Sequence, residues 1–396
     1  MRIINVNPIP SSIFEELGFY WYTSPETPNY VADELVVITE AEGEAYYGAA
    51  NELYDMFIEA GQYAIDHDLY DLFDIPRNLK EMIEVSWEDE SHFHMIGRFD
   101  FAGGVDGKPI KLVELNADTP SVVFEIALIQ WMILKHNKMK EENQFNSLYE
   151  TLKESFIRLK RLHPYFGKHE EKIPRALFSC LNYSIEDENT TRLFEQIAYE
   201  AGFMTDFQYV DKVYFSSNEG IFKKNGEEDV KFDYWFKPIP YEYIGREEPE
   251  LAGILTDILK NKLAILLNPP YALLFQSKSI LKILCDLFPG HPLLLETDFE
   301  PLKDKACVEK KTLGREGANV RILDASGNTL LNTPGDYETY RSIYQEYVDL
   351  PVDAQGRFYQ AGVFFSYEAC GLGFRREKGI IQDRSQFVGH FITNFS

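Results

Sequence analysis

Four polar side chains in the segment 98–116 are candidates for one site, Arg98, Asp100, Glu114 and Asn116, and the last three bear oxygens that could bind a metal ion. Carboxylate and amide oxygens are the ligands that hard cations such as Mg²⁺ prefer. The four residues form two pairs whose members are two positions apart, and side chains two positions apart on a strand share a face. If the two strands are neighbours in a sheet, both pairs meet on one face.

Two short runs with the alternation of strands carry these pairs. They are IGRFDF (96–101) and IKLVELN (110–116), and Asp106-Gly107 between them is a strong signal for a tight turn. Neighbouring strands are about 4.8 Å apart and same-face residues about 6.5 Å apart, so three oxygen-bearing side chains can approach the same ions. We expect the opposite face of this antiparallel hairpin to be apolar: Phe99, Phe101, Val113 and Leu115. The ordinary polar face of a half-buried sheet also explains the pattern.

A possible anion site follows the second run. The segment NADTPS (116–121) leads into VVFEIALIQWMIL (122–134), an apolar run with helical character. Asp118, Thr119 and Ser121 therefore lie at or near a helix N-terminus, where free N–H groups and the helix dipole bind anions or carboxylates. Helix capping also explains these residue types.

A glycine-containing loop lies in the last third of the chain. Lys310 ends the strand-like run ACVEK, and TLGREGAN (312–319) follows it with Gly314 and Gly317. Two glycines between strands make a mobile lid whose N–H groups can approach phosphate oxygens. The loop is not a Walker A motif, since GxxxxGK[ST] is absent, and a plain hairpin turn remains an alternative.

Two further features suit a nucleotide. Lys278 begins an apolar helix, and IYQEYVDLP (343–351) has the character of a hinge that could offer backbone groups to a purine. A solvated helix end and an interdomain connector are the simpler explanations. Taken together, two lysines, a glycine loop, a hinge and oxygen ligands are what phosphoryl transfer from a nucleotide requires.

Composition limits the class of protein. The chain has 396 residues, 45% of them hydrophobic and 14% aromatic, which predicts a globular protein of two or three subdomains. The formal charge of −25 argues against nucleic acid or an anionic membrane as partner and would favour a cationic substrate. No signal peptide or run of ~18 apolar residues is visible, so a soluble cytoplasmic protein is expected. The scattered cysteines are expected to be buried free thiols: Cys180, Cys285, Cys307 and Cys370.

The order of the patterns predicts an α/β fold. Helices are expected within 44–86, over roughly 140–162, and in TTRLFEQIAYEAGF (190–203). Strands are expected at RALFSCLN (175–182), in 207–239 and through the C-terminal third, with a helix near GDYETYRSIYQEYV (335–348).

The motifs in this order resemble the glutathionylspermidine synthetase family of ATP-grasp acid–amine ligases. They are GRFDF, ELNADTPS, QSKSIL, KTLGREGANVRI, YQEY and GLGFRRE, within a resemblance that runs from Ile75-Pro76 to SQFVGHFI near the end. It implies an ATP-grasp fold of the α/β (α+β) class, with mixed and antiparallel sheets and an additional α/β substrate subdomain. It also implies one catalytic unit over 1–396. Its approximate subdomains are an N-terminal part with helices and the metal-binding hairpin (1–165), an α/β part (170–270) and a nucleotide-binding part (271–396).

The resemblance assigns roles to residues. Metal ligands are Asp100, Glu114 and Asn116. Arg98 is the implied catalytic residue, which contacts the acid substrate and stabilises the acyl phosphate, and the carboxylate of the acid is held by Thr119 and Ser121. The residues implied to bind ATP are Lys278, Lys310, Gly317, Gln345, Glu346, Tyr347, Val348, Gln360 and Arg375, with Arg376 an alternative to Arg375. Glu186 and Asp187 are implied to bind free amine groups of the ligand. A cluster of acidic residues that caps a helix N-terminus explains them equally well.

The implied reaction joins a small-molecule acid to an amine with ATP and two Mg²⁺ ions. The γ-phosphoryl of ATP activates the carboxylate as an acyl phosphate, an amine attacks it, and an amide, ADP and phosphate leave. Glutathione or another peptide is a possible acid, and spermidine or an amino compound a possible amine. The best-known members carry an amidase domain first, whereas here the resemblance begins almost at Met1 and no Cys precedes residue 180, so product hydrolysis is not expected.

Two other classes stay open. Asp100 and Glu114 could be a carboxylate pair of a glycoside hydrolase, or the chain could be a catalytically silent nucleotide-binding module. The first would need no ATP, and the second would release no ADP. The sequence indicates no oligomeric state.

Overall fold

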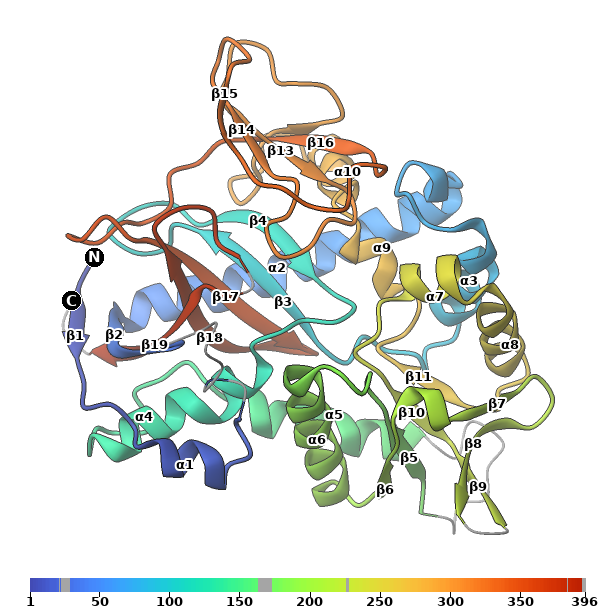
Figure 1. Cartoon of the computed structure of the whole chain (residues 1–396). Coiled ribbons are helices and arrows are strands. Elements are labelled where there is room, and N and C mark those ends of the chain that lie inside the picture. Colours follow the sequence, from blue (N-terminus) through green and yellow to red (C-terminus); the bar gives the residue numbers. More distant parts are fainter. Residues whose placement is uncertain (21, 23–28, 163–172, 226–227, 383, 394–396) are drawn as a thin grey trace.

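A seven-stranded sheet forms the centre of the molecule (Figure 1). The computed structural model describes residues 1–20, 22, 29–162, 173–225, 228–382 and 384–393. The strand order is β1-β2-β19-β18-β17-β3-β4, and all neighbours are antiparallel except β2 and β19. The strands are β1 (Ile3–Asn5), β2 (Val31–Thr39), β3 (Gly97–Ala102), β4 (Lys111–Asn116), β17 (Phe358–Ser366), β18 (Glu368–Glu377) and β19 (Gln386–Thr393).

This sheet joins the two ends of the chain. Strands β17 to β19 lie between β2 and β3, so the predicted metal hairpin is extended by strands from the last 40 or so residues. The first and the last of the three predicted segments therefore share one sheet.

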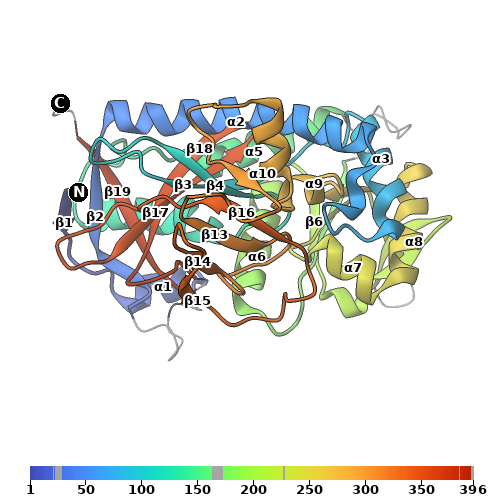
Figure 2. The ribbon, with the colours of Figure 1, turned by 90° about the horizontal axis from the view of Figure 1, so that it is seen from above.

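Helices cover both faces of the large sheet. The long helix α2 (Glu40–Asp66) runs along one face, at the back in Figure 1 and along one long side in Figure 2. Its N-terminus has a capping box, because Thr39 accepts from the Glu42 N–H and Glu42 accepts from the Thr39 N–H. The other face carries α4 (Gln130–His136), α5 (Leu148–Leu162) and the short π-helix Glu125–Ile129.

A second sheet is parallel and belongs to the middle of the chain. Its order is β11-β10-β5-β6, from β5 (Arg175–Phe178), β6 (Met204–Phe207), β10 (Tyr234–Phe236) and β11 (Ile265–Leu267). The helices near it are α3 (Lys80–Glu88), α6 (Ile185–Glu200), α7 (Tyr241–Glu247) and α8 (Pro249–Lys260). A small antiparallel sheet of three strands lies beside them, in the order β7 (Tyr214–Ser216), β8 (Gly220–Asn225) and β9 (Glu228–Phe232).

A third sheet is antiparallel and lies at the top of Figure 1. Its order is β12-β16-β13-β14-β15, from β12 (Thr297–Asp298), β13 (Cys307–Lys311), β14 (Arg321–Leu323), β15 (Thr329–Asn332) and β16 (Ser342–Glu346). The remaining helices are α1 (Ser11–Glu16), α9 (Ala272–Gln276), α10 (Ile280–Leu287) and the 3₁₀ turns Leu69–Asp71, Arg77–Leu79 and Val210–Lys212. Within the described ranges, no helix has both the length and the apolarity to cross a membrane.

Two predicted helices differ from the structure. The helix expected near 335–348 is wrong, because residues 342–346 form strand β16 with Ile343 and Gln345 buried in alternation. Period-two burial between two partner strands outweighs the helical tendency of this run. The helix expected from about 140 begins only at Leu148.

The predicted hairpin forms, with one change of face. Strands β3 and β4 pair with Arg98 opposite Asn116 and Asp100 opposite Glu114. A β-bulge follows, so that Leu112 rather than Val113 packs in the core opposite Phe101, and Val113 lines a cavity instead. The expectation that Val113 shares the apolar face of Leu115 is therefore wrong.

The four cysteines are free thiols, as expected, although Cys285 is only partly buried. The prediction followed from the absence of Cys-x-x-Cys spacing and from the apolar or strand-like sequence around each cysteine.

The hairpin turn generates a stability prediction. Asp106 and Gly107 both have positive φ, as do Gly103 and Gly104, and a Cβ at Gly104 would overlap the ring of Tyr46, whereas one at Gly107 would meet nothing. Gly107→Ala should lower the free energy of unfolding by about 1–2 kcal/mol through backbone strain alone. Gly104→Ala adds overpacking and should cost about 2–4 kcal/mol in the same denaturant titration. Equal losses would show that the contact with Tyr46 does not matter.

Candidate functional site

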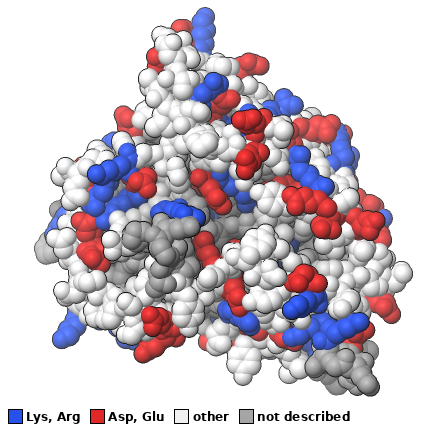
Figure 3. Space-filling model, viewed as in Figure 1, with Lys and Arg blue, Asp and Glu red and all other residues white. Residues whose placement is uncertain are grey.

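One large cavity of about 980 Å³ lies where the seven-stranded, the parallel and the five-stranded sheets meet. The face seen in Figure 3 is hollowed near its centre, with acidic and basic side chains around the hollow. The predicted site residues that line the cavity are Arg98, Glu114, Asn116, Thr119, Ser121, Glu186, Asp187, Lys278, Lys310, Gly317, Gln345, Glu346, Tyr347, Val348, Gln360 and Arg375. The structure thus brings together residues from 98 to 375. Asp100 is fully buried directly behind this lining.

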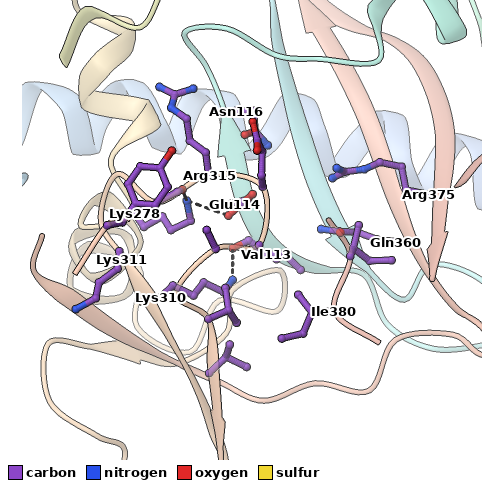
Figure 4. A pocket seen from close by; sticks show the side chains of 18 of the residues that line it. Val113, Glu114, Asn116, Lys278, Lys310, Lys311, Arg315, Gln360, Arg375 and Ile380 are labelled. Carbon is purple, nitrogen blue, oxygen red and sulfur yellow. Dashed lines mark hydrogen bonds and ion pairs between the residues drawn. The ribbon is translucent and has the colours of Figure 1, made fainter. Parts of the chain in front are cut away.

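Two lysines converge on Glu114 (Figure 4). Lys278 Nζ lies 3.2 Å from Glu114 Oε2, and Lys310 Nζ donates to the carbonyl of Val113 at 3.3 Å and to Gln345 Oε1 at 2.7 Å. Burial alone would raise the pKa of Glu114, but the two lysines lower it to about 2. Burial and the nearby Lys278 lower the pKa of Lys310 to about 8. The lysines reach this place from a turn before α10 and from β13.

Asp100 is surrounded by guanidinium and amide groups. Arg98 Nε donates to Oδ1 at 2.6 Å, Arg375 Nη2 to Oδ2 at 2.8 Å and Asn116 Nδ2 to Oδ2 at 3.2 Å. Arg375 comes from β18 and lies across the cavity from Lys278 in Figure 4. Burial and the charge of Arg98 lower the pKa of Arg375.

Strand alternation shows which of Arg375 and Arg376 faces the cavity. Arg375 is paired with Gln360 across β17 and β18, and both line the cavity. Arg376 points to the other side of the sheet, where it contacts Glu34, Tyr359 and Gln386.

The segment after β4 lies at one end of the cavity. Arg98 Nη1 donates to the carbonyl and the hydroxyl of Ser121 at 2.7 and 3.2 Å, and Arg315 Nη1 donates to Thr119 Oγ1 at 3.0 Å. Helical turns begin only at Val123, and the carboxylate of Asp118 is buried and accepts from the Tyr241 N–H at 2.9 Å. Asp118 is therefore part of the support of this segment and not of its surface.

Two buried amides fix the same segment to the rest of the protein. Gln276 Oε1 accepts from the N–H groups of Ala117 and Asp118, at 2.9 and 3.1 Å. Asn268 Nδ2 donates to the carbonyls of both residues, at 3.0 and 2.8 Å. Because Gln276 is two residues before Lys278, the segment and this lysine are tied to one short stretch of chain.

The hinge residues form an edge of the cavity. Gln345 and Glu346 end β16, and the N–H of Tyr347 donates to the carbonyl of Ala306 at 3.0 Å. Tyr347 is exposed, and both it and Val348 line the cavity. Gly317 has a φ of 69°, and a Cβ there would come within 2.8 Å of the carbonyl of Ile381.

Glu186 and Asp187 lie in the first turn of α6, where Ser184 caps the helix by accepting from the Asp187 N–H at 3.2 Å. Both residues also line the cavity. The place therefore suits the capping and the substrate-binding interpretation alike.

The oxygen donors on the β3–β4 face suit Mg²⁺. Asp100, Glu114 and Asn116 lie on paired strands with their oxygen-bearing side chains on one face. Among the described residues, no group of three or more His, Cys, Asp or Glu could hold a metal, so two carboxylates and one amide are what the face offers. This hard, oxygen-only set fits Mg²⁺, which keeps several waters and binds through one or two carboxylates together with phosphates.

Comparison with known proteins decides the family. The model described as "Glutathionylspermidine synthase preATP-grasp" matches residues 1–393. The chain belongs to this family. A Haemophilus influenzae protein named as an acid–amine ligase is 27% identical over 392 residues, which is 95% of each chain. The bifunctional glutathionylspermidine synthetase/amidase of Escherichia coli is 27% identical over 351 residues, 83% of this chain, and the match spans about half of that enzyme's length.

Among solved structures, a glutathione synthetase-like effector from Globodera pallida has a similar fold. Its TM-score is 0.55, with 98% of both chains covered at 11% identity. The glutathionylspermidine synthase family, the ATP-grasp α/β fold and the enzyme class of ATP-dependent C–N-forming ligase, all expected from the motifs, are confirmed.

From the sequence, no role was assigned to two residues at the cavity, Arg315 and Glu242. Arg315 lines the cavity from the glycine loop, and Glu242, fully buried on α7, binds it. The position of Arg315 between Gly314 and Gly317 is visible in the sequence, but its role is not. Nothing in PYEYIGREE distinguishes Glu242 from the exposed acids around it.

The low pKa of Lys310 generates a pH prediction. The folded protein loses this proton near pH 8 and the unfolded chain near 10.5, so the stability lost by burying the charge is recovered as pH rises between these values. Lys310→Met should be more stable than the parent by on the order of 2 kcal/mol near pH 7, and the difference should shrink towards pH ~10.5. Chemical denaturation over this range measures it, with the exposed Lys303→Met as control. A difference independent of pH would contradict the assignment.

Proposed function

We propose that the protein forms an amide bond between a carboxylic acid and an amine through an acyl phosphate, with release of ADP and phosphate. One observation carries this proposal: four cationic side chains surround two carboxylates beside a segment suited to hold an acid. The cations are Arg98, Lys278, Lys310 and Arg375, and the carboxylates are those of Asp100 and Glu114. Two positive charges remain in excess, which suits a polyphosphate.

The cationic residues have a common task in this proposal. A carboxylate and the triphosphate of ATP repel each other, and charge spreads over the transferring phosphoryl group, so fixed positive groups lower the barrier. Lys278 and Lys310 would hold the phosphates, while Arg98 and Arg375 would face the acid and the acyl phosphate. Gln345 to Val348 and Gln360 would bind the nucleotide at the far edge, with Gly317 in the loop that covers it.

The metal site follows from the same charges. Asp100, Glu114 and Asn116 would hold Mg²⁺, two ions in our proposal, in exchange for the protein cations that bind these oxygens now. When bound, Mg²⁺ supplies charge that screens carboxylate from triphosphate. The chain's own part is to keep Glu114 ionised, which its pKa of about 2 ensures.

The acid would lie at Thr119 and Ser121. Both hydroxyls are within hydrogen-bond distance of arginines that can also reach a carboxylate, at 3.0 Å from Arg315 and 3.2 Å from Arg98. Glutathione or another peptide is the proposed acid. Spermidine or an amino compound is the proposed amine, with Glu186 and Asp187 as its anionic partners. Relatives named as glutathionylspermidine synthetases support this choice.

A glycoside hydrolase is not supported. Such an enzyme needs one carboxyl group that stays protonated near neutral pH as general acid. Glu114 has its pKa lowered to about 2, and Asp100 accepts from two arginines.

ADP release tests the proposal directly. Purified protein with ATP and Mg²⁺ is screened against panels of peptides, amino acids and polyamines, singly and in pairs. Release of ADP only when an acid and an amine are both present, with an amide found by mass spectrometry, is the expected result. ATP binding without ADP release for any pair would favour a silent module.

Site variants give the expected magnitudes. Glu114→Gln should lower kcat/KM by about 10²–10³, because it removes a metal ligand and leaves Lys278 without its carboxylate. Exposed Glu300→Gln is the control and should retain activity. If Glu114→Gln and Lys310→Ala both kept full ATP-dependent activity, the site assignment would be wrong.

A further inference from the structure

A buried ion pair fixes the glycine loop (residues 312–319) to helix α7. Arg315 Nη2 and Nε donate to Glu242 Oε1 at 2.7 and 3.1 Å. Glu242 is fully buried, and the side chain of Arg315 is 16% exposed. Helix α7 belongs to the middle of the chain and the loop to the five-stranded sheet, so this pair joins two parts of the protein across the cavity.

The pair orients the one remaining donor nitrogen of Arg315. With Nε and Nη2 on Glu242, Nη1 donates to Thr119 Oγ1 at 3.0 Å. A guanidinium is planar, so fixing two nitrogens fixes the direction of the third. Glu242 therefore decides that Arg315 presents an N–H at Thr119.

The pair also opposes opening of the loop. Glu242 Oε2 has no hydrogen-bond partner among the described residues, so Arg315 supplies the ionic contact of this carboxylate. If the loop moved away, a buried carboxylate would lose its direct ion-pair partner, which is unfavourable. The loop should stay closed on α7 before any substrate binds.

Weaker contacts run along the same helix. Tyr243 and Tyr337 have hydroxyls 3.1 Å apart, and the Arg246 guanidinium lies 4.5 Å from the centre of the Tyr340 ring. On the inner side, Lys278 Nζ donates to the carbonyl of Gly314 at 2.7 Å. Helix α7 is thus the surface on which the loop and the chain after it rest.

We propose that Glu242 is a positioning residue that holds the glycine loop closed on α7 and directs Arg315 towards the acid substrate. This role of Glu242 rests on the proposed function in one respect: the proposed function places the acid at Thr119. Glu242 touches neither acid nor ATP; it holds the loop on α7 and turns Arg315 Nη1 towards the carboxylate of the acid.

Hydrogen–deuterium exchange of residues 312–319 tests the structural half without any substrate. Glu242→Gln should exchange about tenfold faster than the parent in this loop, because the ionic contact is lost. Glu247→Gln, exposed on the same helix, is the matched control and should not change exchange. Loop protection in Glu242→Gln equal to that in Glu247→Gln would overturn the proposal.

A double variant covers the case in which Glu242→Gln does not fold. Glu242→Gln with Arg315→Gln removes both charges, so neither is buried alone. The double variant should be folded, as shown by a cooperative transition on denaturation, and residues 312–319 should exchange as fast as in Glu242→Gln. A folded double variant with full loop protection would equally overturn the proposal.

Kinetics test the catalytic half. Glu242→Gln should raise KM for the acid about tenfold and change KM for ATP by less than about twofold, a split that general destabilisation would not produce. An unchanged KM for the acid sinks the proposal while the ligase function stands. If no acid–amine pair releases ADP with the parent protein, the proposed function fails, and loop exchange still decides whether Glu242 holds the loop.

Discussion

The structure depends on balancing charges that are buried together on one face of β3 and β4. Asp100 is fully buried and Glu114 is partly buried, and the arginines and lysines beside them offset the cost of removing these carboxylates from water. The balance is incomplete, since burial lowers the pKa of Lys310 and of Arg375. Excess positive charge beside an ionised carboxylate suits the polyphosphate and cation of our proposal, and burying these like charges together reduces the stability of the fold.

The fold brings these charges together from segments that are distant in the sequence. Strands β17 and β18 enter the large sheet beside β3, which places Arg375 against Asp100, and β13 of the five-stranded sheet brings Lys310 to β4. The amides of Gln276 and Asn268 then fix the segment after β4 against the stretch that ends in Lys278. The ion pair of Glu242 with Arg315 adds a third support, from the middle of the chain to the loop over the cavity.

Much of this arrangement could be predicted because it is local or because the motifs carry it. The Asp106-Gly107 turn and strand alternation predicted the shared face of Asp100 and Glu114, and the family resemblance supplied Lys278 and Arg375. The bulge at Val113, the strand at 342–346 and the role of Glu242 could not be predicted. The strand and the role of Glu242 are decided by partners far away in sequence, the neighbours of β16 and Arg315, and the bulge is decided by core packing of Leu112 opposite Phe101 within the hairpin.

The central claim is that the β3–β4 face holds a metal–nucleotide complex. A crystal structure of the protein with ADP and Mn²⁺, with the metal located by anomalous scattering, tests it most directly. The account predicts a metal within about 2.5 Å of carboxylate oxygens of both Asp100 and Glu114, with phosphates between Lys278 and Lys310. Metal and nucleotide bound elsewhere, with Arg98 still on Asp100 and Lys278 still on Glu114, would contradict it.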